Sequence, residues 1–346
     1  MKSELAVIVL NWNNWKDTLE CLSSLLKQSY KNFEIILLDN GSTDGSVERI
    51  KQWIRENYSD DRLEYIEYER SSIETNNYSI SPKDPKKTKI TIILNGENLG
   101  FAKGNNVGIK YVLQTGSVRY IFLLNNDTTL EENSLKNLMK EVEKNPEIKV
   151  ATTKICYYDK PDLIWNCGGE ISFLGVRKYY FGKEDEKKCP AKNFEVGLVT
   201  GCALLVDVNI IKKYGALTER FFFGEEDWDF SLRMKKAGVK MFCIPSSVVY
   251  HKVSASTNNF FDKNSIFKSC IHYVNRFVNL KSHYNKVYWY IWREGYFMYI
   301  FYLFKRKKLN NQQALKAISI IRKYSNECDS VTKDIVERIR QEVKSL

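Results

Sequence analysis

A group of acidic side chains next to aromatic rings is the part of this sequence with the clearest chemical potential. The stretch FFFGEEDWDFSLRMKKAG (221–238) places Glu225, Glu226, Asp227 and Asp229 directly after three phenylalanines and a glycine. Charge is unfavourable beside apolar rings, so these acids either form a solvated helix start or include a carboxylate in a partly dry place. A carboxylate of the second kind can act as a general base.

Four polar clusters follow apolar, strand-like runs in the first 130 residues. They are NWNN (11–14), DNGSTDGS (39–46), ENLGFAKGNN (97–106) and NNDTT (125–129). In an open parallel sheet, ligands bind outside the carboxyl ends of the strands, so one shared edge would bring these clusters together. One polar loop alone would carry little weight because loops are commonly polar, but four of them favour a binding site.

Three side chains in or near these clusters are candidate ligands, and two of them, Asp127 and His251, each have a structural alternative. Asp39 ends a strand where an acid can accept a hydrogen bond from a nucleobase, whereas its neighbours are typical turn formers. Asp127 fits either a ligand of a hard divalent cation or the N-cap of the next helix. His251 ends the segment SSVVYH and is either structural or, if it lies near Asp127 in space, a second metal ligand.

Alternating strand and helix patterns must position these residues. Apolar runs rich in Val, Ile and Leu at 5–12 and 33–39 are each followed by a helical pattern, which predicts a parallel sheet with crossover helices. Residues 70–89 are polar, contain two prolines and are expected to form a surface excursion. Between 157 and 198 the pattern weakens into short strands and loops.

Length and composition restrict the class of protein and the number of domains. The 346 residues, 43% of them hydrophobic, exclude a mostly disordered chain and allow an α/β catalytic domain over 1–261 with a helical extension over 262–346. The apolar run Leu5 to Leu10 is too short for an export signal. The eight cysteines show no metal-ligand spacing, and we expect them to be reduced thiols in the cytoplasm.

The extension is aromatic and basic, and nearly all of the net charge of +11 falls in it. More than half of the residues in 288–304 are aromatic, and KRKK (305–308) follows. Because Arg293 and Glu294 interrupt the aromatic run, it is not expected to span a membrane. It suits either the surface of an anionic membrane or packing against the catalytic domain or another subunit.

The last segment carries one apolar stripe at steps of four residues: Val331, Ile335, Ile339 and Val343. Such a stripe favours packing within the chain or self-association, so a homo-oligomer through the C-terminal helices is one expectation. The basic residues accompany no nucleic-acid motif, and no nucleic-acid partner is expected.

The polar clusters and the acidic stretch, in this order, resemble the inverting family 2 glycosyltransferases of the GT-A fold, and above all their rhamnosyltransferase-like branch. The likeness covers roughly the first three quarters of the chain. It implies a Rossmann-like, mixed but mainly parallel sheet flanked by helices. It also implies a nucleotide-diphosphate sugar donor linked to dTDP, UDP or GDP, a divalent Mg²⁺ or Mn²⁺, and hexosyl transfer with inversion at the anomeric carbon.

The resemblance also implies roles for individual residues. Asp127 falls on the family's Asp-any-Asp metal motif, in which Asn125 stands for the first acid, and His251 matches the histidine that approaches the metal. The residues that match the nucleotide-sugar pocket are Asn11, Asp39, Asp44, Asn98, Gly100, Gly104, Asn105 and Asn125. Glu226 and Asp227 match the family's Glu-Asp pair, whose Asp is the expected base.

An inverting transfer is a single displacement, and a carboxylate must accept the proton of the attacking hydroxyl. Asp227 is expected to take this proton, with Glu226 orienting the acceptor and Trp228 forming a wall of its pocket. Asp229 is expected to start or cap the following helix and to pair with Arg233 four residues on. Arg276 lies in a segment that looks like the family's region after the metal histidine, where it is expected to contact acceptor phosphate.

The acceptor implied is a glycan or a lipid-linked saccharide, and the enzyme would work in the cytoplasm at the inner face of the membrane. Two other classes are a sugar nucleotidyltransferase and a sugar-nucleotide-binding protein without transferase activity. A nucleotidyltransferase would need a glycine-rich basic loop after the first strand, where NWNNWKD (11–17) stands. Loss of donor hydrolysis on mutation of Asp127 would separate an enzyme from a binding protein.

Overall fold

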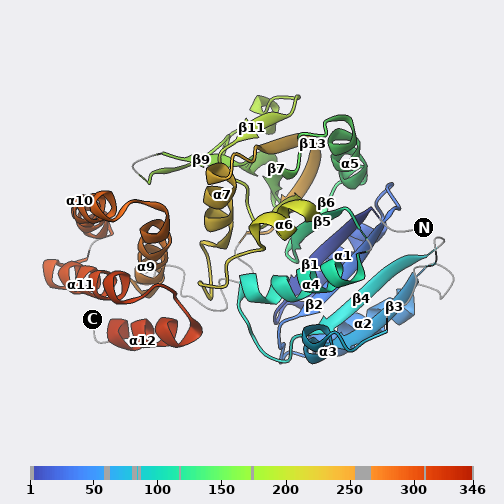
Figure 1. The fold of residues 1–346 in the computed structure, drawn as a ribbon, viewed down its shortest axis with the longest axis horizontal. Helices are drawn as coiled ribbons and strands as arrows, with labels where there is room; N and C mark the ends of the chain where they lie inside the picture. Colours follow the sequence, from blue (N-terminus) through green and yellow to red (C-terminus); the bar gives the residue numbers. More distant parts are fainter. Residues whose placement is uncertain are drawn as a thin grey trace.

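The computed structural model describes residues 4–57, 63–79, 84, 87–116, 118–172, 175–253, 266–307 and 309–344. One 11-stranded mixed sheet crosses the larger part of the molecule, with helices on both of its faces (Figure 1). Four further helices form a separate layer at the C-terminal end (Figure 1). This is the mixed α/β architecture with a helical extension that the sequence predicts.

Half of the sheet is parallel. Its strands, in spatial order, are β5 (Tyr120–Asn125), β1 (Leu5–Asn11), β2 (Phe33–Asp39), β4 (Thr88–Leu94) and β3 (Leu63–Glu69). Asn11 lies opposite Asp39, and Leu10 lies opposite Asn125, so the carboxyl ends of the three central strands are level. The edge strand β3 is absent from the sequence prediction because its alternating glutamates leave only Leu63 fully buried.

The other half of the sheet is mixed. Its strands are β12 (Ala203–Asp207), β7 (Val150–Tyr157), β13 (Met241–His251), β11 (Phe194–Val196), β6 (Thr128–Leu130) and β8 (Lys160–Asn166). β12 runs antiparallel to both β5 and β7, and β13 runs parallel to β7. β6 pairs antiparallel with the end of β13, which places His251 opposite Thr128 and therefore beside the end of β5.

A two-stranded sheet and a short 3-10 helix occupy the region where the sequence pattern weakens. They are β9 (Gly169–Ile171), β10 (Arg177–Tyr179) and η1 (Glu186–Lys188). β10 carries Arg177, which lines the pocket described below. The short strands expected in this region are therefore confirmed, and one of them contributes to the site.

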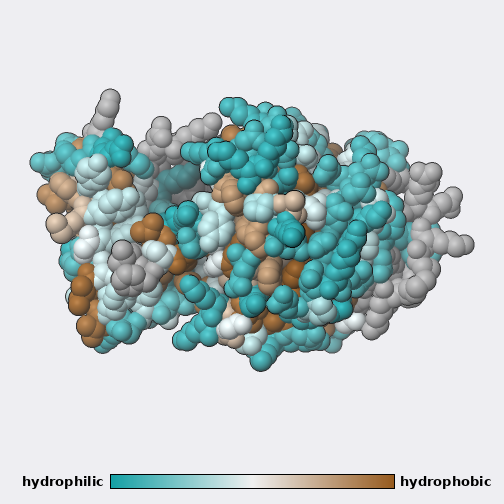
Figure 2. All heavy atoms as spheres, turned by 90° about the horizontal axis from the view of Figure 1, so that it is seen from above, coloured by the Kyte–Doolittle hydropathy of each residue, from teal (hydrophilic) through white to brown (hydrophobic). Residues whose placement is uncertain are grey.

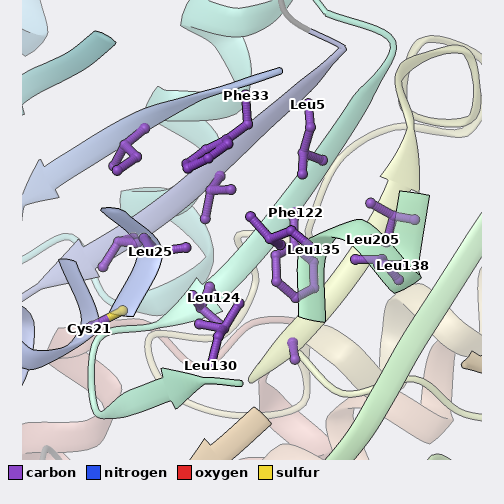
Figure 3. Packing of buried hydrophobic residues seen from close by; sticks show 14 of the residues in the cluster. Leu5, Cys21, Leu25, Phe33, Phe122, Leu124, Leu130, Leu135, Leu138 and Leu205 are labelled. Carbon is purple, nitrogen blue, oxygen red and sulfur yellow. The ribbon is translucent and has the colours of Figure 1, made fainter. Parts of the chain in front are cut away.

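The two faces of the main sheet are covered by different helices. One face packs on α1 (Trp15–Leu26), α2 (Ser46–Asn57) and α5 (Ser134–Lys144). The other packs on α3 (Arg70–Thr75), α4 (Phe101–Thr115), α6 (Val208–Tyr214) and α7 (Glu226–Lys236). Alternate residues of β1 enter the two cores, and Figure 3 shows Leu5 with Phe33 and Phe122 in the first of them. Since α3 buries Ile73, the excursion predicted over 70–89 is in part a packed helix.

The C-terminal layer has a hydrophobic core of its own. It comprises α9 (Ile266–His283), α10 (Lys286–Arg306), α11 (Asn311–Glu327) and α12 (Lys333–Lys344). Phe221 and Phe222, from the loop before α7, are part of the same core. Val331 precedes α12 and buries its side chain against this loop, so the predicted stripe is not one helix face and packs within the chain. The expected boundary at 261/262 lies outside the described residues.

Helix α10 contains the aromatic run and has two unlike sides. Trp289, Trp292, Phe297 and Phe304 are buried in the C-terminal core. The opposite side exposes Val287, Tyr290, Ile291, Met298, Tyr299 and Tyr302. Figure 2 shows exposed hydrophobic side chains on the end of the molecule that these helices form. Within the described part of the chain, no helix combines the length and apolar character that a membrane span requires.

Candidate active site

A pocket of about 480 Å³ opens where the carboxyl ends of β1 and β5, the start of α7 and one side of α9 meet. The predicted site residues that line it are Asn98, Gly100, Asn125, Asp127, Glu226, Asp227, Trp228 and His251. The strands place the first four at one edge of the sheet, and α7 and β13 bring the others to it. The structure therefore gathers the polar clusters and the acidic stretch around one cavity.

Asn11 and Asp39 lie behind the pocket wall and are joined by a hydrogen bond. Asn11 is fully buried and donates a 2.8 Å hydrogen bond from Nδ2 to Asp39 Oδ1. The Asp39 Oδ2 atom accepts from the backbone N–H of Ser42 at 2.9 Å. These bonds keep the Asp39 carboxylate in one orientation at the end of β2.

The other predicted residues outside the lining have local structural contacts. Asp44 accepts a 3.0 Å hydrogen bond from the backbone N–H of Ser46, at the start of α2. Asn105 donates to the carbonyl oxygen of Phe101 one turn earlier in α4. A Cβ on Gly104 would lie 3.0 Å from the Leu10 side chain, so this glycine lets α4 approach β1 closely. Arg276 lies on α9 beside pocket residues and is considered below.

Asn40 is a pocket residue that the sequence suggested only as a turn former. Its Nδ2 donates to Asn98 Oδ1 at 3.1 Å and to the carbonyl oxygen of Gly100 at 3.2 Å. Its Oδ1 accepts from Asn95 Nδ2 at 3.1 Å. This single buried amide joins the loop after β2 to the loop after β4, an arrangement that no local sequence pattern reveals.

Asp127 and His251 meet at the bottom of the pocket. The Nε2 atom of His251 lies 3.2 Å from Asp127 Oδ1, and both side chains are buried. Trp165 packs edge-on against the imidazole, with ring centroids 4.5 Å apart. Among the described residues, Asn125 Oδ1 and His251 Nδ1 are buried here without a hydrogen-bond partner, and Asp127 Oδ1 has no partner besides this imidazole.

These unsatisfied oxygen and nitrogen atoms fit a divalent cation. In the described part of the chain, no cluster of three or more His, Cys, Asp or Glu side chains forms a complete cage. The remaining ligands would therefore be water or the oxygens of a bound diphosphate, as is usual for Mg²⁺.

The acidic stretch forms a tight turn followed by the first turn of α7. Gly224 and Glu225 both have positive φ, and the helix starts at Glu226. Asp227 accepts a 3.3 Å hydrogen bond from the backbone N–H of Gly201. Burial raises the pKa of Asp227 above its ordinary value, and burial together with the neighbouring Asp227 raises that of Glu226. Both carboxyls are thus poised to exchange a proton nearer to neutral pH.

Asp229 does not cap the helix, because α7 begins three residues before it. Its Oδ2 accepts a 2.7 Å hydrogen bond from Arg233 Nε, so the predicted pair at a spacing of four residues is formed. Its Oδ1 lies 3.0 Å from His283 Nε2 on α9. Burial alone would raise the pKa of Asp229, but His283 and Arg233 outweigh this and hold it below its ordinary value.

Glu225 has no role in the sequence prediction and proves to be the centre of an ionic cluster. Its carboxylate forms an ion pair with Arg177 of β10 and accepts a 2.9 Å hydrogen bond from Asn279 of α9. Burial opposes its charge, but Arg177 outweighs this and holds the pKa of Glu225 below its ordinary value. The Arg177 guanidinium also lies 3.9 Å from the centroid of the Trp228 ring.

Helix α9 holds the acid-bearing loop along one stripe. Asn275, Asn279 and His283 follow one another at intervals of four residues and therefore share a helix face. They contact the Phe223 carbonyl oxygen, the Glu225 carboxylate and the Asp229 carboxylate in that order. The partners are about 50 residues apart in the sequence, so only the folded chain shows this arrangement.

The loop after β4 touches the acid-bearing loop directly. Gly100 has a φ of 80°, and a Cβ there would lie 2.2 Å from the carbonyl oxygen of Phe222. Only glycine combines this backbone conformation with so close an approach. The loop after β4 and the loop that carries the acids therefore touch each other beside the pocket.

The sheet is Rossmann-like, and one pocket holds the strand-end carboxylate Asp127 beside His251 and, on another side, the acid pair Glu226–Asp227. Residues 6–78 and 74–215 match the family model described as glycosyl transferase family 2. The chain belongs to glycosyl transferase family 2, as the resemblance of its motifs implies.

Two curated relatives illustrate the likeness in sequence. Glycosyltransferase GlyG of Streptococcus pneumoniae serotype 4 is 26% identical over 162 residues, which are 47% of this chain and 42% of that protein. The dTDP-rhamnosyl transferase RfbF of Shigella flexneri is 24% identical over 177 residues, 51% of this chain and 57% of RfbF. The aligned region thus spans about half the length of these relatives.

Three solved structures share the fold. GalNAc-T7 with UDP, GalNAc and Mn²⁺ has a TM-score of 0.58 at 14% identity, covering 99% of this chain and 58% of that chain. Mannosyltransferase PcManGT of Pyrobaculum calidifontis with GDP-Man and Mn²⁺ scores 0.51 at 14% identity, with coverages of 100% and 81%. Residues 1–349 of TarS from S. aureus with UDP score 0.51 at 12% identity, with coverages of 99% and 88%. The expected GT-A fold is confirmed.

Proposed function

We propose that this protein is an inverting glycosyltransferase that moves a hexosyl-type sugar from a nucleotide-diphosphate sugar to a hydroxyl group of a glycan or lipid-linked saccharide. The observation that carries the proposal is the half-buried Asp227 carboxyl, which lines the same pocket as the Asp127–His251 pair in a family 2 chain. RfbF is described as a dTDP-rhamnosyl transferase, and the solved neighbours hold UDP or GDP-Man. These names support a donor linked to dTDP, UDP or GDP.

Asp127 and His251 would hold a divalent Mg²⁺ or Mn²⁺, with Asn125 offering a further oxygen. Two of the solved neighbours contain Mn²⁺, which supports this assignment. When bound, such a cation offsets the negative charge that develops on the departing diphosphate. His251 is kept in place by the edge of Trp165, so the ligand direction is set by packing.

Asp227 accepts the proton of the acceptor hydroxyl. The acceptor oxygen forms a bond to the anomeric carbon while the bond from that carbon to the diphosphate oxygen breaks, and its electron pair leaves with the nucleoside diphosphate. The hydrogen bonds from the backbone N–H groups of Gly201 and Trp228 orient the Asp227 carboxylate. Its raised pKa favours proton acceptance near neutral pH. Glu226 orients the acceptor, and Trp228 forms part of its pocket.

The donor nucleotide would lie across the ends of β1, β2 and β4. Asp39 would accept from the base, with Asn11 holding it in place, and Asn98 and Gly100 would border the sugar. Asp44, Gly104 and Asn105 would support this loop structure from outside the lining, as their contacts indicate.

The exposed side of α10 would place the enzyme at the cytoplasmic face of a membrane. Its apolar side chains include Ile291 and Met298, and the exposed Lys305 and Arg306 follow them along the helix. Such a face suits an anionic lipid surface, and self-association through the same face is the alternative. Co-sedimentation with phosphatidylglycerol vesicles, but not with phosphatidylcholine vesicles, would support the membrane, whereas a dimer that no vesicle captures would support self-association.

A screen of nucleotide sugars tests the function. The expected result is metal-dependent release of nucleoside diphosphate from one donor, which increases when acceptor is added. Asp227→Asn should retain donor binding and lose transfer, and retained turnover would remove Asp227 from its role. Release of pyrophosphate from a sugar phosphate and a nucleoside triphosphate would instead identify a nucleotidyltransferase. Donor binding without turnover of any donor in the panel would identify a binding protein.

A further inference from the structure

A buried arginine beside the pocket has no carboxylate partner among the described residues. Arg276 of α9 is only 9% exposed, donates from one terminal nitrogen to Tyr296 Oη at 2.6 Å, and directs the other at His272 Nε2, 3.0 Å away. Its Nε atom is buried without a hydrogen-bond partner. A buried charge normally needs a partner of opposite sign, so this guanidinium is electrostatically incomplete.

The nearby acids do not supply the missing charge through a hydrogen bond. Glu225 is the loop carboxylate with a depressed pKa, and it is bonded to Arg177 and Asn279. Glu226 and Asp227 have raised pKa values because they are buried, and no hydrogen bond joins either to an arginine in the described structure. Burial lowers the pKa of Arg276, and the second positive charge of the nearby Arg177 lowers it further.

His272 lies between Arg276 and the pocket that both the ring and Lys268 line. A guanidinium only donates, so the Nε2 atom that faces Arg276 must accept, and the ring proton then lies on Nδ1. The surrounding protein partly desolvates the ring, and this together with the charges of Arg276 and Arg177 lowers the pKa of His272, which keeps it neutral. The ring itself lies open to the pocket that it lines. Lys268, one helical turn earlier on α9, lines the same pocket.

We propose that this wall of the pocket, formed by Lys268, His272 and Arg276 of α9 with Arg177 of β10, binds a phosphate group on the acceptor. The inference rests on the proposed transferase function and names the acceptor class. An ammonium group and an imidazole N–H are donors that a phosphate oxygen accepts well, and the guanidinium behind them supplies uncompensated charge. The ligand is a phosphate or diphosphate ester, such as a lipid diphosphate or a phosphorylated glycan.

The position of the wall separates this group from the diphosphate of the donor. Arg177 stacks on Trp228 and forms an ion pair with Glu225. In the sequence, Glu225 and Trp228 stand on either side of Glu226 and Asp227, the acid pair that contains the proposed general base. The donor diphosphate belongs instead at Asp127 and His251. A phosphate that rests on the α9 wall is therefore carried by the molecule whose hydroxyl faces Asp227.

Calorimetric titration tests the subsite, with the donor site first filled by UDP, GDP or dTDP and Mn²⁺. The probes are N-acetylglucosamine 1-phosphate, farnesyl diphosphate and, as the uncharged match, N-acetylglucosamine. We expect the phosphorylated probes to bind and the uncharged sugar to bind at least about tenfold more weakly. A preference between the two phosphorylated probes separates a sugar phosphate from a lipid diphosphate.

Variants locate the binding. Lys268→Gln and His272→Ala should each weaken binding of the phosphorylated probes by about tenfold or more, and leave the affinity for the nucleoside diphosphate unchanged. Lys140→Gln, on the exposed side of α5 at the other end of the molecule, is the matched lysine control and should change neither (Figure 1). His272→Gln, which retains an acceptor for Arg276 and an N–H donor, should recover part of the loss.

Two results would overturn the inference: equal binding of the uncharged sugar, or an equal loss of nucleoside diphosphate affinity in the Lys268 and His272 variants. The second result would assign the wall to the donor. Failure of the transferase proposal looks different, because wild-type protein would then release no nucleoside diphosphate from any donor even while the phosphorylated probes bind to the α9 wall.

Discussion

Asn279 of α9 donates a 2.9 Å hydrogen bond to Glu225 Oε2, the same carboxylate oxygen that forms the ion pair with Arg177 of β10. Glu225 has a positive φ and directly precedes the proposed catalytic pair. Three segments that are distant in sequence therefore meet at one oxygen and set the direction in which α7 leaves the pocket. The C-terminal helices therefore help to position the loop that leads into the proposed catalytic pair.

Removing the Asn279 contact should impair catalysis more than donor binding. Asn279→Ala deletes a buried hydrogen bond to a charged group, which is worth roughly 1.5–3 kcal/mol. We expect kcat to fall and KM for the donor to stay within about twofold, because Asn279 acts through Glu225 and touches no proposed donor residue. Asn279→Asp is the matched variant of nearly the same shape and should be worse, since two carboxylates would then face each other. Equal changes in kcat and KM would argue against a positioning role.

The Asp229 ion pairs should make stability depend on pH in the acid range. The pKa of Asp229 is lower in the folded protein than its ordinary value, so its contribution is complete above about pH 4 and is lost as the pH falls further. Asp229→Asn should therefore lower the free energy of unfolding by about 1.5–3 kcal/mol at neutral pH. The difference from wild type should shrink below pH 4 in urea unfolding. A difference that is constant from pH 7 down to pH 3 would contradict this account.

Gly100 and Gly96 form a matched pair for the contact between the two loops. Both have positive φ, but a Cβ at Gly96 meets nothing within 4 Å, whereas one at Gly100 would overlap the Phe222 carbonyl. Gly96→Ala should cost about 1–2 kcal/mol of backbone strain and preserve activity. Gly100→Ala should in addition displace the acid-bearing loop and abolish transfer. Steady-state rates of transfer and thermal unfolding should be measured for both variants. Similar activities of the two variants would show that transfer does not need the contact between the two loops.

The pH dependence of transfer should reflect the titration of the acid pair Glu226–Asp227. A base works only when deprotonated, so kcat/KM should fall as the pH drops through the pKa of the Asp227–Glu226 pair. Because burial raises these pKa values, that acid limb should lie above the ordinary range of an aspartate, about pH 3.9. A pH–rate profile with saturating donor and metal is the measurement. An acid limb near pH 4 would place the base elsewhere.

Substitutions at Asn125 and at Asp127, the two members of the proposed metal motif, should change the affinity for metal in opposite directions. Asp127→Asn removes the carboxylate and should weaken Mn²⁺ binding by more than about tenfold, while Asn125→Asp adds a charged oxygen beside it and should strengthen binding. Mn²⁺ titration followed by electron paramagnetic resonance measures this without any turnover. If neither variant alters Mn²⁺ binding, the metal is held at another place or is not used.

Much of the proposed donor side of the pocket follows from the sequence alone. Strand ends are local features, since apolar runs that stop at Asn11, Asp39 and Asn125 mark where a buried strand gives way to a loop. Parallel pairing then brings such ends to one edge, whatever the loops contain. For that reason the fold, the pocket edge and the place of Asp127 could all be predicted before any coordinates were known.

The proposed acceptor side of the pocket depended on tertiary structure. The partners of Glu225 are Arg177, in a region with no clear periodicity, and Asn279, which reads as an ordinary polar position of a helix. The edge strand β3 was missed, and Val331 was grouped with the stripe of the last helix although it precedes that helix and pairs with Phe221, a neighbour distant in sequence. Periodicity reports which residues of one segment share a face. It cannot report which distant segment that face meets, and this pairing gives Glu225, Asn279 and Arg276 their places beside the pocket.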